Sequence, residues 1–222
     1  NEQEHIFSIQ FNADYTDFSA RMLWYLGPSK EEWDKFNGLG GSSAPTSFYN
    51  KYDEWDLRLE HNLAKTWRGQ PFKDSRIAVI KYWDRTGKQM LDHDGLNFPV
   101  FRYADVLLMY AEALNEISYS NSQTSDAMVA LNAVHTRAGL SPVQITELAD
   151  QDSFRKAIML ERQQEFPYEG QRWFDLVRMG GAKEAMKAEG HIIQDYQFLY
   201  PIPKTELERI NNTELLWQNT GY

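Results

Sequence analysis

Cysteine is absent from the 222-residue sequence. This absence excludes a disulfide framework, a thiolate nucleophile and any metal site built on cysteine. The histidines do not compensate for it, because no two of them have the spacing of metal ligands on one helix. They are His5, His61, His93, His135 and His191. A phosphate-binding loop is not expected either, since Gly38–Gly41 contains no lysine. We therefore expect no metal and no cofactor.

Long apolar runs are also missing. The longest, such as Val106–Ala111, are far shorter than the roughly 20 residues that a membrane-spanning helix needs, so no such helix is expected. The stretch Asn1–His5 is neither basic nor followed by the apolar core of a signal peptide. We therefore expect the chain to start inside a longer precursor.

Basic residues are in the minority. The sequence has 23 Lys and Arg against 32 Asp and Glu, which gives a net charge of -9. The negative balance extends over both halves of the chain, so no basic face is available to neutralise phosphates. Nucleic acid is therefore not an expected partner.

What the first 98 residues have in abundance is aromatic side chains and turn residues. Five of the seven tryptophans precede Pro99. Glycine and proline interrupt residues 12–46 repeatedly, which predicts a long irregular segment with one short helix from Ser29 to about Gly38. The other elements predicted here are strands at His5–Phe11 and Ile77–Trp83 and an aromatic-rich helix at Thr46–Leu63.

Residues 99–222 have the apolar periodicity of packed helices. Pro99 suits the first turn of a helix, and Gly139 suits the end of one. The predicted helices run from Pro99 to about Ser118, from Ser125 to Ala138, from about Asp152 to Pro167, and from Gly170 to Met179 with Phe174 buried. A weak helix follows Gly181, and Phe198–Pro203 is expected to be extended. We predict a mainly α fold with long irregular loops and a minor β component, divided into a loop-rich region, 1–98, and a helical scaffold, 99–222.

The pair Glu161 and Glu165 is the first candidate for chemistry. Their i, i+4 spacing places both carboxylates on one helix face, as an acid and a base would require. The alternative is interhelical ion pairing, which the surrounding arginines favour and which needs no serine, threonine or histidine nearby. Those arginines are Arg155, Arg162, Arg172 and Arg178. We interpret the pair as part of the scaffold and expect no enzyme.

The segment Asp92–Asn97 superficially resembles a calcium-binding loop. Its glycine stands at the fourth position instead of the sixth, and no glutamate follows in register to complete the coordination. We do not expect calcium binding.

The irregular segment carries a second candidate site. Trp24, Tyr25, Trp33 and Phe36, together with Asp34, combine flat aromatic faces with a carboxylate. Aromatic rings can pack against the apolar faces of sugars while polar groups bond the hydroxyls, and loops on a rigid scaffold commonly carry such side chains. The alternative is that these rings cap a small core.

The helical half resembles the SusD/RagB family of outer-membrane nutrient-binding lipoproteins. The matching blocks are Phe98–Glu116, Leu131–Leu140, Glu161–Phe166, Glu169–Arg178, Tyr200–Pro203 and Gln218–Tyr222, with weaker similarity at Pro45–Tyr49. The sequence departs from the family pattern at His135, Gln163 and Pro167. These are scaffold positions.

The resemblance implies a helical protein held at the cell surface by a lipid on an N-terminal cysteine, over a SusC-like TonB-dependent transporter. Such a protein captures a glycan, or sometimes a peptide, for import. The family is about twice as long as this chain, so we expect a C-terminal portion that meets the membrane only through an anchor elsewhere. The matched motifs do not fix the ligand-contacting residues. One hypothesis is therefore glycan binding at the aromatic segment, and the other is an interaction module that docks the transporter while the absent N-terminal half binds the nutrient.

Overall fold

The computed structural model of the chain describes residues 4–12, 14, 21–29, 31, 39–40, 42–83 and 95–222. These residues belong to two compact units, Asn1–Gly170 and Gln171–Tyr222. Helices predominate in both units, and every described strand is two to five residues long. The mainly α fold class with a minor β component is confirmed. The predicted division into a loop-rich region, 1–98, and a helical scaffold, 99–222, stays a prediction.

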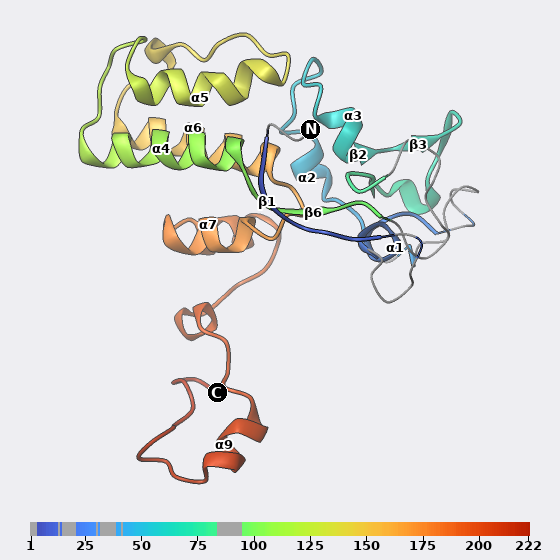
Figure 1. Cartoon of the computed structure of the whole chain (residues 1–222), viewed down its shortest axis with the longest axis vertical. Coiled ribbons are helices and arrows are strands. Elements are labelled where there is room, and N and C mark those ends of the chain that lie inside the picture. Colours follow the sequence, from blue (N-terminus) through green and yellow to red (C-terminus); the bar gives the residue numbers. More distant parts are fainter. Residues whose placement is uncertain are drawn as a thin grey trace. The chain divides into compact units, whose positions relative to one another are not determined.

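The first unit begins with short elements and ends with long helices (Figure 1). Its short elements are β1 His5–Ile9, α1 Met22–Leu26, α2 Thr46–Tyr49, α3 Leu59–Asn62, β2 Leu63–Ala64, β3 Thr66–Trp67, β4 Gln70–Pro71, η2 Lys73–Ser75, β5 Ala78–Val79 and β6 Phe98–Arg102. Its later elements are α4 Tyr103–Ile117, α5 Asp126–Arg137, η3 Ile145–Glu147 and α6 Gln151–Glu165.

Helices α4, α5 and α6 pack together into the helical core of this unit (Figure 1). Ser125 caps α5 by accepting a hydrogen bond from the Met128 amide, and Asp150 starts α6 with a reciprocal capping box. Between the helices lie the largest fully buried side chains, which include Leu108, Met128, Leu131, Phe154 and Ile158. These predicted helices therefore form because side chains cap the free amides at the starts of α5 and α6 and because their apolar faces are buried against one another.

The predicted start of the first long helix is wrong. Phe98–Arg102 forms strand β6, which pairs antiparallel with β1, and α4 begins only at Tyr103. Pro99 is tolerated because the sheet has two strands and each strand keeps one free edge, where a missing amide costs no ladder bond. The Tyr103 amide then donates to the Glu4 carbonyl at 2.8 Å.

The aromatic-rich helix predicted over Thr46–Leu63 is also wrong in its extent. Only its two ends, α2 and α3, are helical. Between them the carboxylate of Asp53 accepts from the Trp55 amide, and that of Asp56 accepts from the Arg58 amide, both at 2.9 Å. Such side-chain bonds offer the backbone an alternative to the helix. The strand predicted over Ile77–Trp83 is shortened in the same region to β5.

The short elements enclose two small apolar clusters. One contains Phe72, Ala78, Ile80 and Tyr82, and the other contains Ala44, Tyr52, Leu63, Ile77 and Val79. These clusters give the first part of the chain a core of its own, separate from the helical core. The short helix predicted from Ser29 to Gly38 lies mostly outside the described residues.

The second unit contains α7 Arg172–Arg178, α8 Ala182–Ala188, η4 Asp195–Phe198 and α9 Lys204–Ile210. Its tail is pinned by aromatic residues, since the Tyr222 hydroxyl donates to the Leu199 carbonyl at 2.9 Å. Phe174, which was expected to be buried, is 65% exposed. It lies two positions before the buried Leu176 and therefore on the opposite side of α7.

Candidate functional site

Glu161 and Glu165 lie on one face of α6 and are both buried. Glu165 bonds to Arg102 at 2.8 Å and to Arg137 at 2.5 Å. Glu161 bonds to the Arg58 guanidinium at 2.6 Å and to Nδ1 of His135 at 2.7 Å. Segments far apart in the sequence thus converge on two carboxylates.

The network extends beyond this pair of glutamates. Arg102 also holds Glu169 through two guanidinium nitrogens at 3.0 and 2.9 Å, and Lys81 pairs with Glu169 at 2.5 Å. Burial alone would raise the pKa of Glu165, but the guanidinium groups of Arg102 and Arg137 outweigh it and lower the pKa to about 2. A carboxylate held in this way stays ionised at neutral pH and cannot donate a proton there.

The pair is therefore structural, as the sequence indicated, and the partners that the structure shows for it come from outside the expected group of arginines. Arg155 pairs with Glu116 and Arg178 with Asp175, while Arg162 makes a buried pair with Asp105 at 2.7 Å. Arg162 follows Glu161 directly, so helical geometry turns it about 100° away from the carboxylate face. The actual partners come from segments whose approach cannot be read from helical spacing.

Metal binding finds no support in the described part of the chain, where no group of three or more His, Asp and Glu side chains could hold an ion. Asp92, His93 and Asp94 of the calcium-like segment lie outside the described residues. Among the described helices, none is long and apolar enough to cross a membrane.

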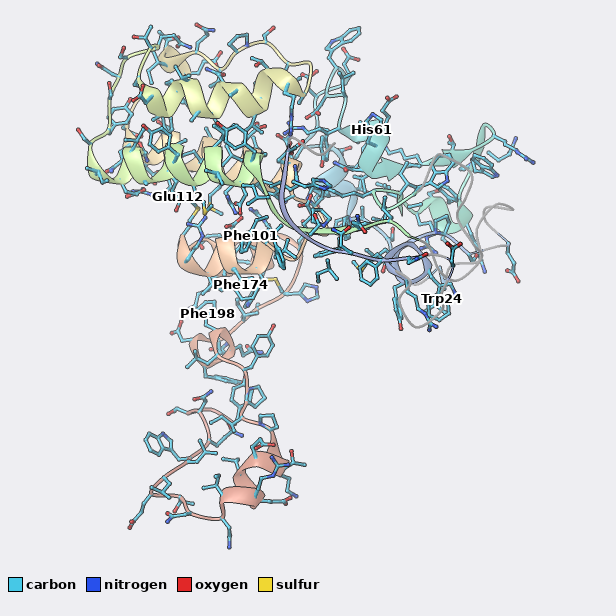
Figure 2. All side chains as sticks on the ribbon, viewed as in Figure 1. Trp24, His61, Phe101, Glu112, Phe174 and Phe198 are labelled. Carbon is cyan, nitrogen blue, oxygen red and sulfur yellow. The ribbon has the colours of Figure 1, made fainter. Side chains whose placement is uncertain are left out.

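Trp24 and Tyr25 lie next to each other on α1, as Figure 2 shows for Trp24. Their ring centroids are 4.9 Å apart and the rings meet edge to face at 73°. Met22 and Leu26 of the same helix pack against the Phe72 cluster, so the core is capped by these aliphatic side chains. Tyr25 is 52% exposed and Trp24 is half-buried. The helix that carries the pair is therefore anchored in the core, while the ring of Tyr25 is accessible to a ligand.

The predicted site is only partly defined by the structure. Trp33, Asp34 and Phe36 lie outside the described residues. The Trp24 carbonyl accepts from the Leu39 amide at 2.8 Å, and Leu39 lines a hollow of about 690 Å³. The polar side chains in the wall of this hollow are Ser29, Glu31, Gln70, Lys73 and Arg76. Sequence reasoning missed Gln70 and Lys73, because strand β4 and the turn η2 bring them to the hollow that Leu39 lines only in the folded chain.

Sequence reasoning also missed Trp55, which is 72% exposed. Spacings of three and four placed it on the apolar face of a helix that does not form. The signal that could have found it is the pair of aspartates on either side, Asp53 and Asp56, since aspartate favours turns over helix interiors. Trp55 lines a second cavity, of about 430 Å³, beside the end of α5.

Comparison with known proteins gives one consistent family. The family model described as SusD family matches residues 5–222. The "SusD-like protein P2" of Formosa agariphila is 36% identical over 99% of this chain and 48% of its own length. The "Surface glycan-binding protein A" of Bacteroides fluxus matches with a TM-score of 0.75 and 28% identity over 99% of this chain and 51% of its own. A "Laminarin binding SusD-like protein" matches with a TM-score of 0.72 and 27% identity, again over 99% and 50%.

Two facts follow from these relatives. The chain spans about half the length of the proteins that it matches. Their descriptions are those of binding proteins, which agrees with the prediction that the chain is not an enzyme.

Proposed function

The chain belongs to the SusD family, and from this premise we propose that it is a surface glycan-binding protein that captures oligosaccharide for import. Its ligand is carried to a SusC-like TonB-dependent transporter in the outer membrane. A lipid anchor outside the 222 residues holds the whole protein at the cell surface.

The observation that supports this proposal is the Trp24–Tyr25 pair. The exposed Tyr25 ring offers a flat apolar face with a polar hydroxyl at its edge, and the half-buried Trp24 ring meets it edge to face at 73°. The helix that carries both rings is anchored in the core by Met22 and Leu26. A preorganised surface loses little conformational entropy when a ligand binds. The laminarin-binding description of one structural relative points to a β-glucan as the first ligand to try.

The test is binding of the purified chain to laminarihexaose, maltohexaose and cellohexaose, measured by calorimetry. We expect the double change Trp24→Ala with Tyr25→Ala to weaken binding at least tenfold, which corresponds to about 1.4 kcal/mol. Trp217→Ala is the matched control, because it removes a tryptophan that is 67% exposed in the other unit. Unchanged affinity in the double variant, with wild-type binding present, would remove the pair from the site.

A second candidate function is supported by the length of the chain, which is about half that of its relatives. In this view the chain docks the transporter, and the other half of the whole protein binds the nutrient, whether glycan or peptide. The same titrations decide between the two proposals. Absence of binding to every oligosaccharide by the folded chain would favour the docking module.

A further inference from the structure

The turn formed by residues 53–57 exposes the side chain of Trp55 to solvent, and hydrogen bonds fix its backbone. Within the turn, the Asp56 amide donates to the Asp53 carbonyl at 3.1 Å, and the Asp53 carboxylate accepts from the Trp55 amide at 2.9 Å. At the last residue of the turn, the Leu57 amide donates to the Ala138 carbonyl at the end of α5, at 2.9 Å. The turn is thus fixed to the helical core, although Trp55 itself remains 72% exposed.

The approach of this turn to α5 depends on Gly139. Its φ of +88° is in the left-handed region, and a Cβ there would lie 2.9 Å from Cγ of Leu57 and 3.4 Å from the Trp55 carbonyl oxygen. Glycine therefore lets two segments more than 80 positions apart in sequence come into contact. Their contact forms one wall of the 430 Å³ cavity beside Trp55.

The wall of the cavity combines apolar side chains with hydrogen-bond donors and acceptors. Trp55, Leu140 and Leu160 supply apolar surface, and Asp53 and Ser141 supply an acceptor and a hydroxyl. Within the described residues, Oδ2 of Asp53 and the Ser141 hydroxyl make no hydrogen bond. Lys51, His135 and Gln164 also line the cavity, so its wall contains an acidic and a basic side chain together with neutral polar groups, and neither sign of charge dominates it.

A neutral ligand with alternating apolar and hydroxyl-bearing faces fits this lining best. The volume is within the range of small-ligand sites. We propose that the cavity beside Trp55 is a second carbohydrate subsite, in which the indole stacks on a sugar ring while Asp53 and Ser141 bond its hydroxyls. This inference rests on the proposed function, since it assumes that the protein binds glycans. No residue of the lining is shared with α1.

The experiment is calorimetric titration of the chain with laminarihexaose, which reports both affinity and the number of sites. We expect two hexasaccharides per wild-type chain and one in Trp55→Ala. Trp55→Phe, which keeps a flat ring, should restore the second site with affinity within about tenfold of wild type. Ser141→Ala should weaken the same site while the thermal midpoint stays unchanged.

A measurement on the unaltered protein guards against misfolding of the variants. N-bromosuccinimide oxidises exposed indoles, and peptide mass spectrometry locates the products. We expect laminarihexaose to protect Trp55 at least threefold and to leave Trp217 unprotected. Equal oxidation of Trp55 with and without ligand, or one site per chain in both wild type and Trp55→Ala, would overturn the second subsite while leaving the proposed function intact. Absence of all binding would instead overturn both.

Discussion

Replacing Glu165 by Gln tests how much the buried ion network stabilises the fold. The substitution removes one negative charge and keeps the size of the side chain, so no cavity forms. Glu165 is held by Arg102 at 2.8 Å, by Arg137 at 2.5 Å and by Arg58 at 3.3 Å. The variant leaves the largely buried guanidinium groups of Arg102 and Arg58 with one fewer counter-ion, which is strongly unfavourable in a low-dielectric interior, whereas Arg137 is partly exposed to water.

The magnitude follows from the pKa of Glu165. Burial acts to raise this pKa, yet Arg102 and Arg137 lower it from 4.5 to about 2, which corresponds to roughly 3 kcal/mol of folded-state stabilisation. Removing one partner of a buried pair costs a similar 3–5 kcal/mol or so. For a unit of this size, a loss of about 3 kcal/mol lowers the thermal midpoint by roughly 6–12 °C.

The pH dependence has a definite sign. Because the folded-state pKa is below the unfolded value, the stabilisation is complete above about pH 4.5 and is lost as the pH falls toward about 2. Urea unfolding followed by tryptophan fluorescence should therefore give a large difference between wild type and Glu165→Gln at pH 7. The difference should shrink between pH 4.5 and pH 2.

The control is Glu116→Gln, which removes a carboxylate that pairs with Arg155 at 2.7 Å at the surface. Exposed ion pairs contribute little, so its unfolding midpoint should stay close to that of wild type. A Glu165→Gln variant as stable as the control at pH 7 would refute the assignment of the stabilisation to this network.

Two further predictions concern packing and the backbone. Phe154→Ala should cost about 3–5 kcal/mol, because Phe154 is 1% exposed and its removal leaves a cavity, whereas Ile117→Ala, at 81% exposure, should cost less than about 0.5 kcal/mol. Gly139 and Gly180 both have a positive φ, +88° and +75°, so alanine is strained at either position. Only at Gly139 would the Cβ also press on Leu57, so Gly139→Ala should cost about 1–3 kcal/mol and more than Gly180→Ala, whose Cβ meets no atom within 4 Å. Urea unfolding checks each pair of variants, and equal losses within a pair would contradict the reasoning.

The long helices were predictable because the signals that form them are local. Ser125 caps α5, Gly139 ends it, and apolar side chains recur at helical spacing along α4 and α6. The motif blocks in the same segment were sufficient to indicate the family, which the family model confirmed over residues 5–222. Capping residues, apolar spacing and the order of the motif blocks can all be read directly from the sequence.

The pairing of β6 with β1 was not predictable in this way. Phe98–Arg102 joins a strand more than 90 positions earlier, so its conformation depends on a partner that local pattern cannot reveal. The same reason applies to the break between α2 and α3. There the local turn bonds of Asp53 and Asp56 prevail over the helical spacing of the aromatic residues.

The sequence by itself determined the absence of cysteine chemistry, the mainly helical class and the choice of aromatic residues as candidate ligand contacts. Only the tertiary structure decided which charges meet and which rings face water. Arg58, Arg102 and Arg137 reach Glu161 and Glu165 from separate segments, and the exposed Trp55 lies on a turn that is bonded to the end of α5. Contacts of this kind depend on chain segments meeting in space, which neither composition nor periodicity encodes.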